Sequence, residues 1–238
     1  MIILITGAVR GIGLSLARAA GAAGHQVVLN YRNGSARAEA ETLAREIAAD
    51  AGDACALQAD VSVAGDVQRL IAGAVERFGG LDCVVNNAGI GQHIPLNALD
   101  EGAFNRTLQA NLTSAFLVSQ AAWPHMTERG GRLIFLSSGA ARTGGGLSAA
   151  YAASKAGIEG LMHSYATTLR PYRITANAIA PTGIDTDMAS AVSMPPPDRL
   201  PMGRLGRADE IWPAMRMILE TEYLTGQTIH IDAGHYMT

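Results

Sequence analysis

The chain has 238 residues, of which 48% are hydrophobic and 16% are charged, and its formal net charge at pH 7 is -3. An apolar, weakly charged chain of this length forms an ordered core, and a small negative charge provides no basic field for nucleic acid. Glycine stands out, because an average usage of about 7% would give roughly 17 residues, and the chain has 27. Two cysteines, Cys55 and Cys83, are typical of a reducing compartment, and the six scattered histidines show no metal-ligand spacing.

The first apolar run, Ile2–Ile5, leads directly into Gly7 and leaves no room for a charged leader peptide. No apolar run approaches the roughly 20 residues that a membrane-spanning helix requires. We therefore expect a cytoplasmic protein that contacts no membrane, binds no nucleic acid and holds no metal.

Short apolar runs alternate with segments of helical length along the whole chain. The runs are continuous rather than alternating, which is typical of strands buried on both faces of a parallel sheet. They are Ile2–Ile5, Val27–Leu29, Cys55–Ala59, Leu81–Val85, Leu133–Leu136, Ile174–Ile179 and Gln227–Ile231. The helical segments are Gly11–Gly24, Ser35–Ala51, Ala64–Phe78, Ala103–Glu128 and Ala149–Leu169. This alternation predicts an α/β fold with a single Rossmann-type, doubly wound parallel sheet of about seven strands and helices on both faces. Ligands bind such sheets beyond the carboxyl ends of the strands.

A glycine-rich turn follows the first predicted strand, in the sequence Thr6–Gly13. Glycines between a strand and a helix let the backbone approach a diphosphate, and the helix N-terminus supplies unpaired N–H groups. The spacing is G-x-x-x-G-x-G rather than the common G-x-G-x-x-G. We expect the cofactor phosphates to contact Gly7, Val9, Arg10, Gly11, Ile12 and Gly13.

The second predicted strand ends in Asn30, Tyr31 and Arg32, with no acidic residue between Leu29 and Ala38. An NAD site usually carries an acid here for the ribose 2′-hydroxyl, whereas an arginine accommodates the 2′-phosphate of NADP. Arg10 is a second cation near the same place. These residues favour NADP(H), and the alternative is two solvated surface arginines.

The third and fourth predicted strands are followed by polar residues of ambiguous role. Asp60 and Val61 can contact the adenine, or Asp60 can cap the helix that begins near Ala64. In the sequence Asn86–Gly89, an asparagine can bond either backbone or cofactor. The candidate cofactor contacts here are Asn87, Ala88 and Gly89.

The segment 103–128 carries an apolar stripe with one polar exception. The residues Phe104, Leu108, Leu112 and Phe116 recur every four positions and predict one buried helix face. Asn111 lies among them, although asparagine is a poor residue inside a helix. A buried amide needs partners, so Asn111 is either a satisfied core residue at a bend or a functional group.

The fifth predicted strand ends at Ser138, and Tyr151 and Lys155 follow four residues apart on one helix face. A phenol with a pKa near 10 is a poor acid–base group at neutral pH, and a nearby ammonium group lowers that pKa. The hydroxyl of Ser138 can bond a substrate oxygen beside the phenol. An exposed helix pair is the ordinary explanation of such spacing, but its place after a phosphate loop favours catalysis.

Together these motifs resemble those of the short-chain dehydrogenase/reductase family, in its NADP-preferring branch near the 3-oxoacyl-(acyl carrier protein) reductases. The resemblance runs from Ile2 almost to Thr238 and includes Asn177–Pro181, Ile184–Thr186, Gly203–Gly206 and Leu224–Asp232. It implies that the segment closing over the nicotinamide carboxamide supplies Pro181, Ile184 and Thr186. It also implies a catalytic tetrad of Asn111, Ser138, Tyr151 and Lys155.

In that tetrad Tyr151 donates a proton to the developing alkoxide, and Lys155 lowers the tyrosine pKa and holds the nicotinamide ribose. Ser138 stabilises the carbonyl oxygen, and Asn111 positions a water in the proton relay. The implied reaction is the NADP(H)-dependent interconversion of a carbonyl and a secondary alcohol. The implied domain is residues 1–238, with a cofactor half of about 1–130 and a catalytic and substrate half of about 131–238.

The first substrate hypothesis is a 3-oxoacyl thioester of fatty acid biosynthesis, carried by acyl carrier protein or coenzyme A. Another ketone, a sugar or a cyclic alcohol is the alternative, and a non-catalytic NADP-binding sensor is the alternative of a different class. The family commonly forms homotetramers, and a homodimer is also compatible. We expect the substrate pocket to include Ser138 and Tyr151 together with Gln92, His93, Arg142, Leu147 and Met188.

Three features depart from the family pattern. Thr182 stands where glycine usually follows the proline, which bears on the loop beside the nicotinamide. The segment Leu169–Ile174 looks several residues shorter than in the acyl-carrier reductases, which puts carrier binding in doubt. The proline-rich segment Met188–Pro201 is either a surface loop or a lid over the substrate.

Overall fold

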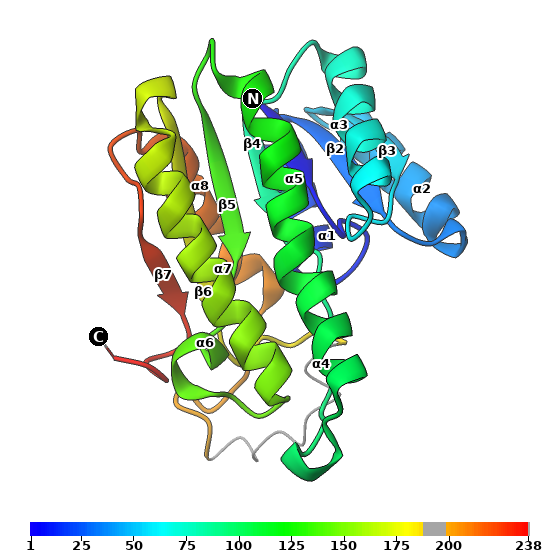
Figure 1. Cartoon of the computed structure of the whole chain (residues 1–238). Helices are drawn as coiled ribbons and strands as arrows, with labels where there is room; N and C mark the ends of the chain where they lie inside the picture. Colours follow the sequence, from blue (N-terminus) through cyan, green and yellow to red (C-terminus); the bar gives the residue numbers. More distant parts are fainter. Residues whose placement is uncertain (188–198, 238) are drawn as a thin grey trace.

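The computed structural model describes residues 1–187 and 199–237. Seven parallel strands form one sheet in the order β3-β2-β1-β4-β5-β6-β7 (Figure 1). The strands are β1 (Ile2–Ile5), β2 (Gln26–Tyr31), β3 (Asp53–Gln58), β4 (Cys83–Asn86), β5 (Gly131–Leu136), β6 (Ile174–Pro181) and β7 (Thr228–Ile231). The predicted single doubly wound sheet is therefore confirmed. The strand order reverses between β1 and β4, which is where such sheets open a crevice for ligands.

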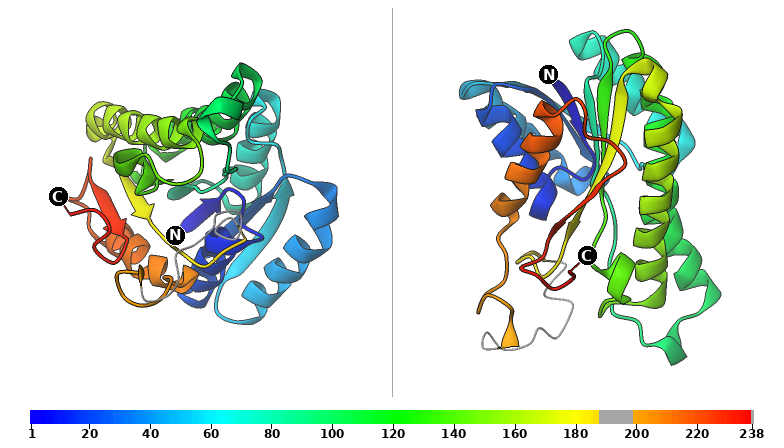
Figure 2. Two further views of the ribbon diagram at one scale, coloured as in Figure 1. Left: turned by 90° about the horizontal axis from the view of Figure 1, so that it is seen from below. Right: turned by 90° about the vertical axis from the view of Figure 1, so that its left-hand side faces the viewer.

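Helices cover both faces of the sheet, as Figure 2 shows in its right-hand view. One face carries α1 (Gly11–Ala22), α2 (Arg37–Ala49) and α8 (Trp212–Glu220). The other carries α3 (Ala64–Phe78), α4 (Glu101–Leu108), α5 (Ser114–Ala122) and α7 (Ala149–Thr168). A short helix, α6 (Ala140–Thr143), lies between β5 and α7. Single turns of 3₁₀-helix occupy Gly34–Ala36, Leu96–Ala98, Trp123–Met126, Arg170–Tyr172 and Ala208–Ile211.

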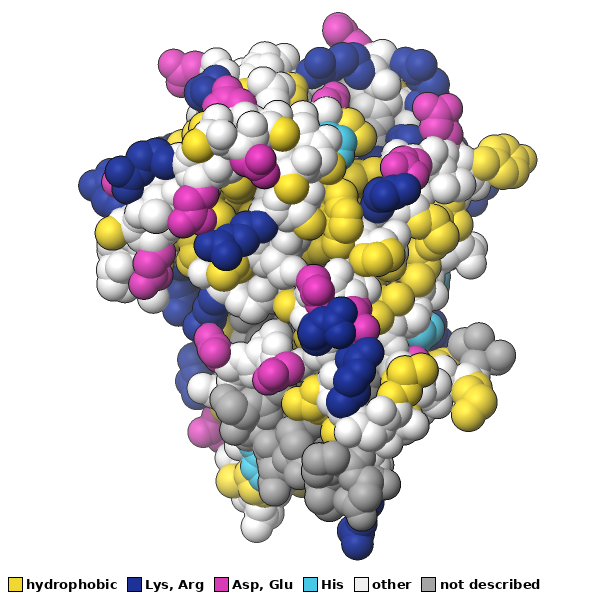
Figure 3. Space-filling model, turned by 180° about the vertical axis from the view of Figure 1, so that it is seen from behind, with side chains coloured by type: hydrophobic (Ala, Val, Ile, Leu, Met, Phe, Trp, Pro, Cys, Tyr) yellow, Lys and Arg dark blue, Asp and Glu magenta, His cyan; other side chains and the backbone are white. Residues whose placement is uncertain are grey.

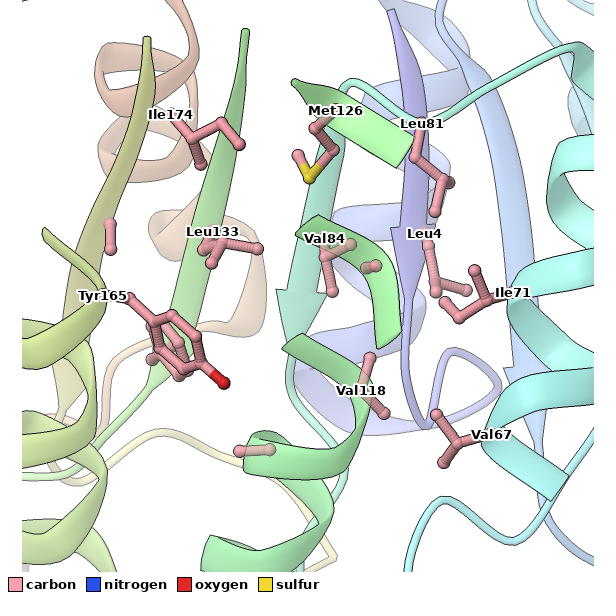
Figure 4. Close-up of a cluster of buried hydrophobic side chains, with 14 of the residues drawn as sticks. Leu4, Val67, Ile71, Leu81, Val84, Val118, Met126, Leu133, Tyr165 and Ile174 are labelled. Carbon is pink, nitrogen blue, oxygen red and sulfur yellow. The ribbon is translucent and has the colours of Figure 1, made fainter. Parts of the chain in front are cut away.

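The strands are apolar throughout because each sends alternate side chains into two separate cores. Leu4 and Val84 point toward α3 and α5, where they meet Ile71 and Val118 (Figure 4). Their neighbour Ile3 points the other way, into the core beneath α1 and α8. Both faces of the sheet are thus filled, and the polar side chains that end the strands collect at one edge.

Contrary to the prediction, the segment 103–128 is not one regular helix with a buried apolar stripe. A π-helical turn over Gln109–Thr113 separates α4 from α5, and Phe116 is 44% exposed. Residues four apart drift by about 40° around a helix of 3.6 residues per turn, so the stripe winds away from the core. The buried face instead holds small or polar side chains, including Ala103, Thr107 and Asn111.

Figure 3 shows the face that carries α1, α2 and α8, where basic and acidic side chains are interspersed rather than segregated. Among the described helices, none combines the length and the apolar character needed to cross a membrane. Within residues 1–187 and 199–237, no group of three or more histidine, cysteine or acidic side chains has an arrangement that suits a metal ion.

Candidate active site

The carboxyl ends of the central strands surround a cavity of about 1340 Å³. Most of the residues predicted for the cofactor, catalysis and substrate line it, from the glycine turn after β1 to the segment after β6. Four described residues do not: Gly13, Asn111, His93 and Arg142. The predicted pocket residue Met188 and residues 188–198 of the predicted lid lie outside the described residues. His230 and Asp232 also line the cavity from the end of β7, although the segment Leu224–Asp232 pointed only to the family and to no site role.

The glycine turn lines the cavity with Gly7, Val9, Arg10, Gly11 and Ile12. Helix α1 begins at Gly11, and its N-cap residue Arg10 makes no side-chain hydrogen bond to the first turn. Gly13 does not touch the cavity but permits the turn to close, because a Cβ at this position would overlap the carbonyl oxygen of Gly7 and the Nδ2 atom of Asn87. An uncapped helix N-terminus behind a tight glycine turn is suited to a phosphate group.

Two predicted cofactor asparagines use their side chains to build this turn. Asn87 donates from Nδ2 to the carbonyl oxygens of Thr6 at 2.8 Å and Gly7 at 3.1 Å. Asn30 is buried, accepts from the Gly7 amide at 3.2 Å and donates to the Ala59 carbonyl at 3.1 Å. Both asparagines line the cavity, but their amide groups are engaged with backbone and hold the ends of β1, β2, β3 and β4 together.

Arg10 and Arg32 are both exposed and both line the cavity. Asp60 lies close to Arg32 and accepts hydrogen bonds from the amide of Ser62 at 2.9 Å and its hydroxyl at 2.6 Å. Burial opposes ionisation of Asp60, but the Ser62 hydrogen bonds and the Arg32 charge outweigh it and lower the pKa of the carboxyl group. Asp60 does not cap α3, whose N-cap residue is Val63.

Tyr151 and Lys155 share the face of α7 that meets the end of β5. Helix α7 begins at Ala149, and the Ser148 hydroxyl caps it by accepting from the Tyr151 amide at 3.2 Å. The Tyr151 hydroxyl is hydrogen-bonded to Ser138. The Lys155 Nζ atom lies 5.6 Å from the centroid of the Tyr151 ring and donates to the Leu136 carbonyl at 2.6 Å. Serine, phenol and ammonium groups therefore converge on one wall of the cavity.

The pKa values in this cluster follow burial. Burial raises the pKa of Tyr151, and the hydrogen bond with Ser138 only partly opposes that effect. Burial also lowers the pKa of Lys155 to about 8. The expectation that the neighbouring ammonium group lowers the tyrosine pKa is therefore wrong for this structure, because loss of solvation dominates at both groups.

Asn111 is buried beside the cavity wall, and its side chain is fully engaged. Its Oδ1 atom accepts from the Ile90 amide at 2.7 Å, and its Nδ2 atom donates to the Ile90 carbonyl at 3.0 Å and to the Ser154 hydroxyl at 2.9 Å. Both donors of the amide are used by protein groups, and the implied role of Asn111 in positioning a water stays a prediction. It ties the loop after β4 to α7, and the π-helical turn provides the bend that the sequence left open as an alternative.

Arg142 does not contribute to the substrate pocket as predicted. Its Nη2 atom lies 2.6 Å from Oε2 of Glu159, a carboxylate that is almost fully buried behind the cavity wall. The opposite charge on α7 therefore draws the arginine away from the cavity. Sequence analysis did not identify Glu159, which lies eight positions after Tyr151 and carries no motif of its own.

Comparison with known proteins agrees with the fold. A family model described as enoyl-(acyl carrier protein) reductase matches residues 7–236. The chain is similar to 3-oxoacyl-[acyl-carrier-protein] reductase FabG of Staphylococcus aureus, with 38% identity over 98% of this chain and 97% of the relative. It is also similar to L-rhamnose 1-dehydrogenase (NAD(P)(+)) of Azotobacter vinelandii, with 36% identity over 99% and 96% of the two chains. The crystal structure of a short-chain type dehydrogenase/reductase from Mycobacterium marinum superposes with a TM-score of 0.92 at 30% identity, covering 100% of this chain and 96% of that one.

Proposed function

The chain belongs to the short-chain dehydrogenase/reductase family, and from this premise we propose that it is an NADP(H)-dependent reductase of a carbonyl group, with a 3-oxoacyl thioester as its substrate. The observation that carries the proposal is the buried Tyr151 hydroxyl, which is bonded to Ser138 on the cavity wall and followed one helical turn later by Lys155. A purely structural tyrosine would not need a cavity beside its hydroxyl group.

The residues around the cavity fit a dinucleotide. The uncapped N-terminus of α1 and the turn through Gly7 would hold the diphosphate, and Arg10 and Arg32 would hold a 2′-phosphate. Asp60 and Val61 would contact the adenine, and the nicotinamide would lie against Pro181, Ile184 and Thr186. When bound in its reduced form, the nicotinamide supplies a hydride to the carbonyl carbon.

The chain's own residues supply the proton and the binding of the carbonyl oxygen. The raised pKa of Tyr151 keeps its phenol protonated at neutral pH, which is the form that donates in the direction of reduction. Ser138 orients the carbonyl oxygen of the substrate through its hydroxyl. As the phenol O–H bond of Tyr151 breaks, its proton forms the new O–H bond of the alcohol. Lys155 lies against the phenol ring and helps to return a proton to the tyrosinate. Positioned acid catalysis of this kind contributes about 10²–10⁴-fold in rate.

The similarity to the 3-oxoacyl-[acyl-carrier-protein] reductases supports a thioester substrate, carried by acyl carrier protein or coenzyme A. A cavity of about 1340 Å³ exceeds the usual 300–1,000 Å³ of a single ligand site and leaves room for a substrate beside the cofactor. The cavity also includes Gln92 and Leu147. A sugar is the second candidate substrate, because the L-rhamnose dehydrogenase is nearly as similar to this chain.

We also propose that the protein assembles as a homotetramer or homodimer. Phe116, on the outer face of α5, is 44% exposed in the single chain, and a second copy would cover it.

The proposal is tested by measuring NADPH oxidation with acetoacetyl thioesters and cyclic ketones, and NADP⁺ reduction with L-rhamnose and other sugars. Turnover of acetoacetyl thioesters above all other substrates is expected. Preferential oxidation of L-rhamnose with NADP⁺ would assign the sugar instead. Tight NADPH binding without turnover of any carbonyl would contradict an enzymatic function and favour a cofactor-binding sensor.

A further inference from the structure

Glu159 is a buried carboxylate that the proposed reaction does not use. It is only 4% exposed and lies on the face of α7 that also carries Tyr151 and Lys155, since these residues are spaced four apart. Acidic side chains are almost never fully buried unless they are paired. A buried charge at this place therefore calls for an explanation beyond filling space.

The three α7 side chains contact three consecutive residues at the end of β5. Tyr151 bonds Ser138, Lys155 donates to the Leu136 carbonyl at 2.6 Å, and Glu159 accepts from the Ser137 hydroxyl at 2.9 Å. Ser137 itself is fixed to β6, because its amide donates to the Ile179 carbonyl at 2.8 Å. The Glu159 contact thus determines where the residue next to Ser138 lies relative to α7.

The second oxygen of Glu159 holds the helix that follows Ser138. Arg142 reaches it from α6, which packs against α7 as Figure 1 shows. Helix α6 has only four residues, and a helix this short has little stability of its own. The residues just after it, Gly145 and Gly146, line the cavity, so the ion pair also fixes this part of the substrate wall.

We propose that Glu159 and Arg142 are positioning residues that hold Ser138 against the Tyr151 hydroxyl. The proposal rests on the function proposed above, because Ser138 and Tyr151 act there on the carbonyl oxygen. Glu159 holds the end of β5 in place through Ser137, and Arg142 holds α6 in place. Neither residue touches the reacting atoms.

A paired apolar replacement separates positioning from stability. Removing one partner of a buried ion pair leaves an uncompensated charge and destabilises the fold, whereas replacing both by apolar residues of similar volume is often neutral. The double variant Arg142→Met/Glu159→Leu should therefore unfold at a temperature close to that of the wild type. Arg142→Met should unfold lower, because it leaves the buried Glu159 charge uncompensated, whereas Arg142 is 42% exposed and stays solvated in Glu159→Leu. In the double variant the Ser137 hydroxyl keeps only its 3.4 Å contact with the Lys155 carbonyl, so the catalytic geometry should remain impaired.

The test compares the wild type, both single variants and the double variant for kcat, KM, NADPH affinity and melting temperature. We expect the stable double variant to lose about tenfold or more in kcat with unchanged NADPH affinity, because the glycine turn is untouched. Arg77→Met is the matched control. Arg77 also forms an ion pair, at 2.6 Å from Asp53, but this pair lies on the surface and is far in sequence from Arg142 and Glu159. Wild-type kcat in the double variant would overturn the proposal.

A crystal structure of the double variant provides a readout that does not depend on turnover. We expect Ser138 to have moved out of hydrogen-bonding distance of the Tyr151 hydroxyl. An unchanged Ser138–Tyr151 contact would refute the positioning role even if the wild type reduces no carbonyl. Absence of wild-type turnover together with displacement of Ser138 would instead contradict only the proposed function.

Discussion

The side chain of Thr182 fills the space in which a side chain at Gly139 would lie. A Cβ atom at residue 139 would overlap the Thr182 hydroxyl oxygen, while it would stand 3.4 Å from the Thr182 Cβ atom. The two backbones are also joined, because the Gly139 amide donates to the Pro181 carbonyl at 3.2 Å. Thr182 thus stands where the family resemblance implies a glycine, and Gly139, directly after Ser138, makes room for it.

This complementarity predicts a reciprocal pair of variants. Gly139→Ala should lower the free energy of unfolding by about 1–3 kcal/mol, because overpacking forces neighbouring groups apart. Adding Thr182→Ala should restore most of the loss, since the remaining Cβ atom leaves an ordinary contact distance. Urea denaturation of the wild type, the two single variants and the double variant measures the coupling.

Gly160→Ala is the control for the Gly139 experiment, because a Cβ at residue 160 meets no atom within 4 Å. That change should leave stability unaltered or raise it by about 0.4–1 kcal/mol, through the lower entropy of the unfolded chain. Additive effects of Gly139→Ala and Thr182→Ala would show that the two side-chain positions do not compete for space.

Most of the sheet can be predicted from the sequence, because parallel strands buried on both faces are continuous apolar runs. Each of the seven predicted runs overlaps an observed strand, and the motifs after β1, β4 and β5 meet at one edge as the fold class requires. The short helix α6 and the fit of Thr182 onto Gly139 carry no local signal. Helix α6 depends on its packing against α7, and the fit of Thr182 onto Gly139 depends on a contact between segments far apart in the chain.

Apart from the apolar stripe of segment 103–128, the errors concern polar residues whose partners are set by tertiary structure. Arg142 was expected in the pocket, but its partner Glu159 becomes its neighbour only when α6 packs against α7. The identity of Asn111 indicated a bend or a function, and its three hydrogen bonds became visible only with the loop at Ile90 in place. The Tyr151 pKa depends on burial, which spacing along a helix does not reveal.

Lys155 is the only lysine in the chain, so its ionisation can be followed alone. Protein labelled isotopically at lysine should give one side-chain NMR resonance, apart from any signal of the terminal amine. We expect that resonance to titrate with a pKa of about 8 rather than its ordinary 10.5, because burial disfavours the ammonium form. Titration near 10.5 would contradict the burial of this group.

The same shift predicts the direction of a pH effect on stability. Between about pH 8 and 10.5 the unfolded chain holds a proton on Lys155 that the folded chain has lost, so its contribution to stability rises with pH. That contribution is fully present above 10.5 and is lost as the pH falls through about 8. The difference in unfolding free energy between the wild type and Lys155→Met should follow this course. Taking this difference also removes the opposing effect of buried tyrosines and cysteines, which is common to both proteins.

The preference for NADP(H) has a separate test at the two exposed arginines. Charge reversal by Arg10→Glu or Arg32→Glu should weaken NADPH binding by about tenfold or more, since hydrogen bonds to charged groups contribute about 1.5–3 kcal/mol. NADH affinity should change little, because NADH has no 2′-phosphate. Arg45→Glu, on an exposed face of α2 outside the cavity, is the control. Equal or tighter binding of NADH than NADPH by the wild type would refute the preference.

The central claim is that Tyr151 is the proton donor of a carbonyl reduction, and the Tyr151→Phe variant tests it most directly. NADPH oxidation with acetoacetyl thioester is compared between wild type, Tyr151→Phe and Tyr165→Phe, a tyrosine of the same helix whose hydroxyl bonds Gln120 at 3.2 Å outside the cavity. We expect kcat to fall by about 10²–10⁴-fold in Tyr151→Phe alone, with NADPH binding retained. Turnover at the wild-type rate by Tyr151→Phe would contradict the role of Tyr151 as proton donor.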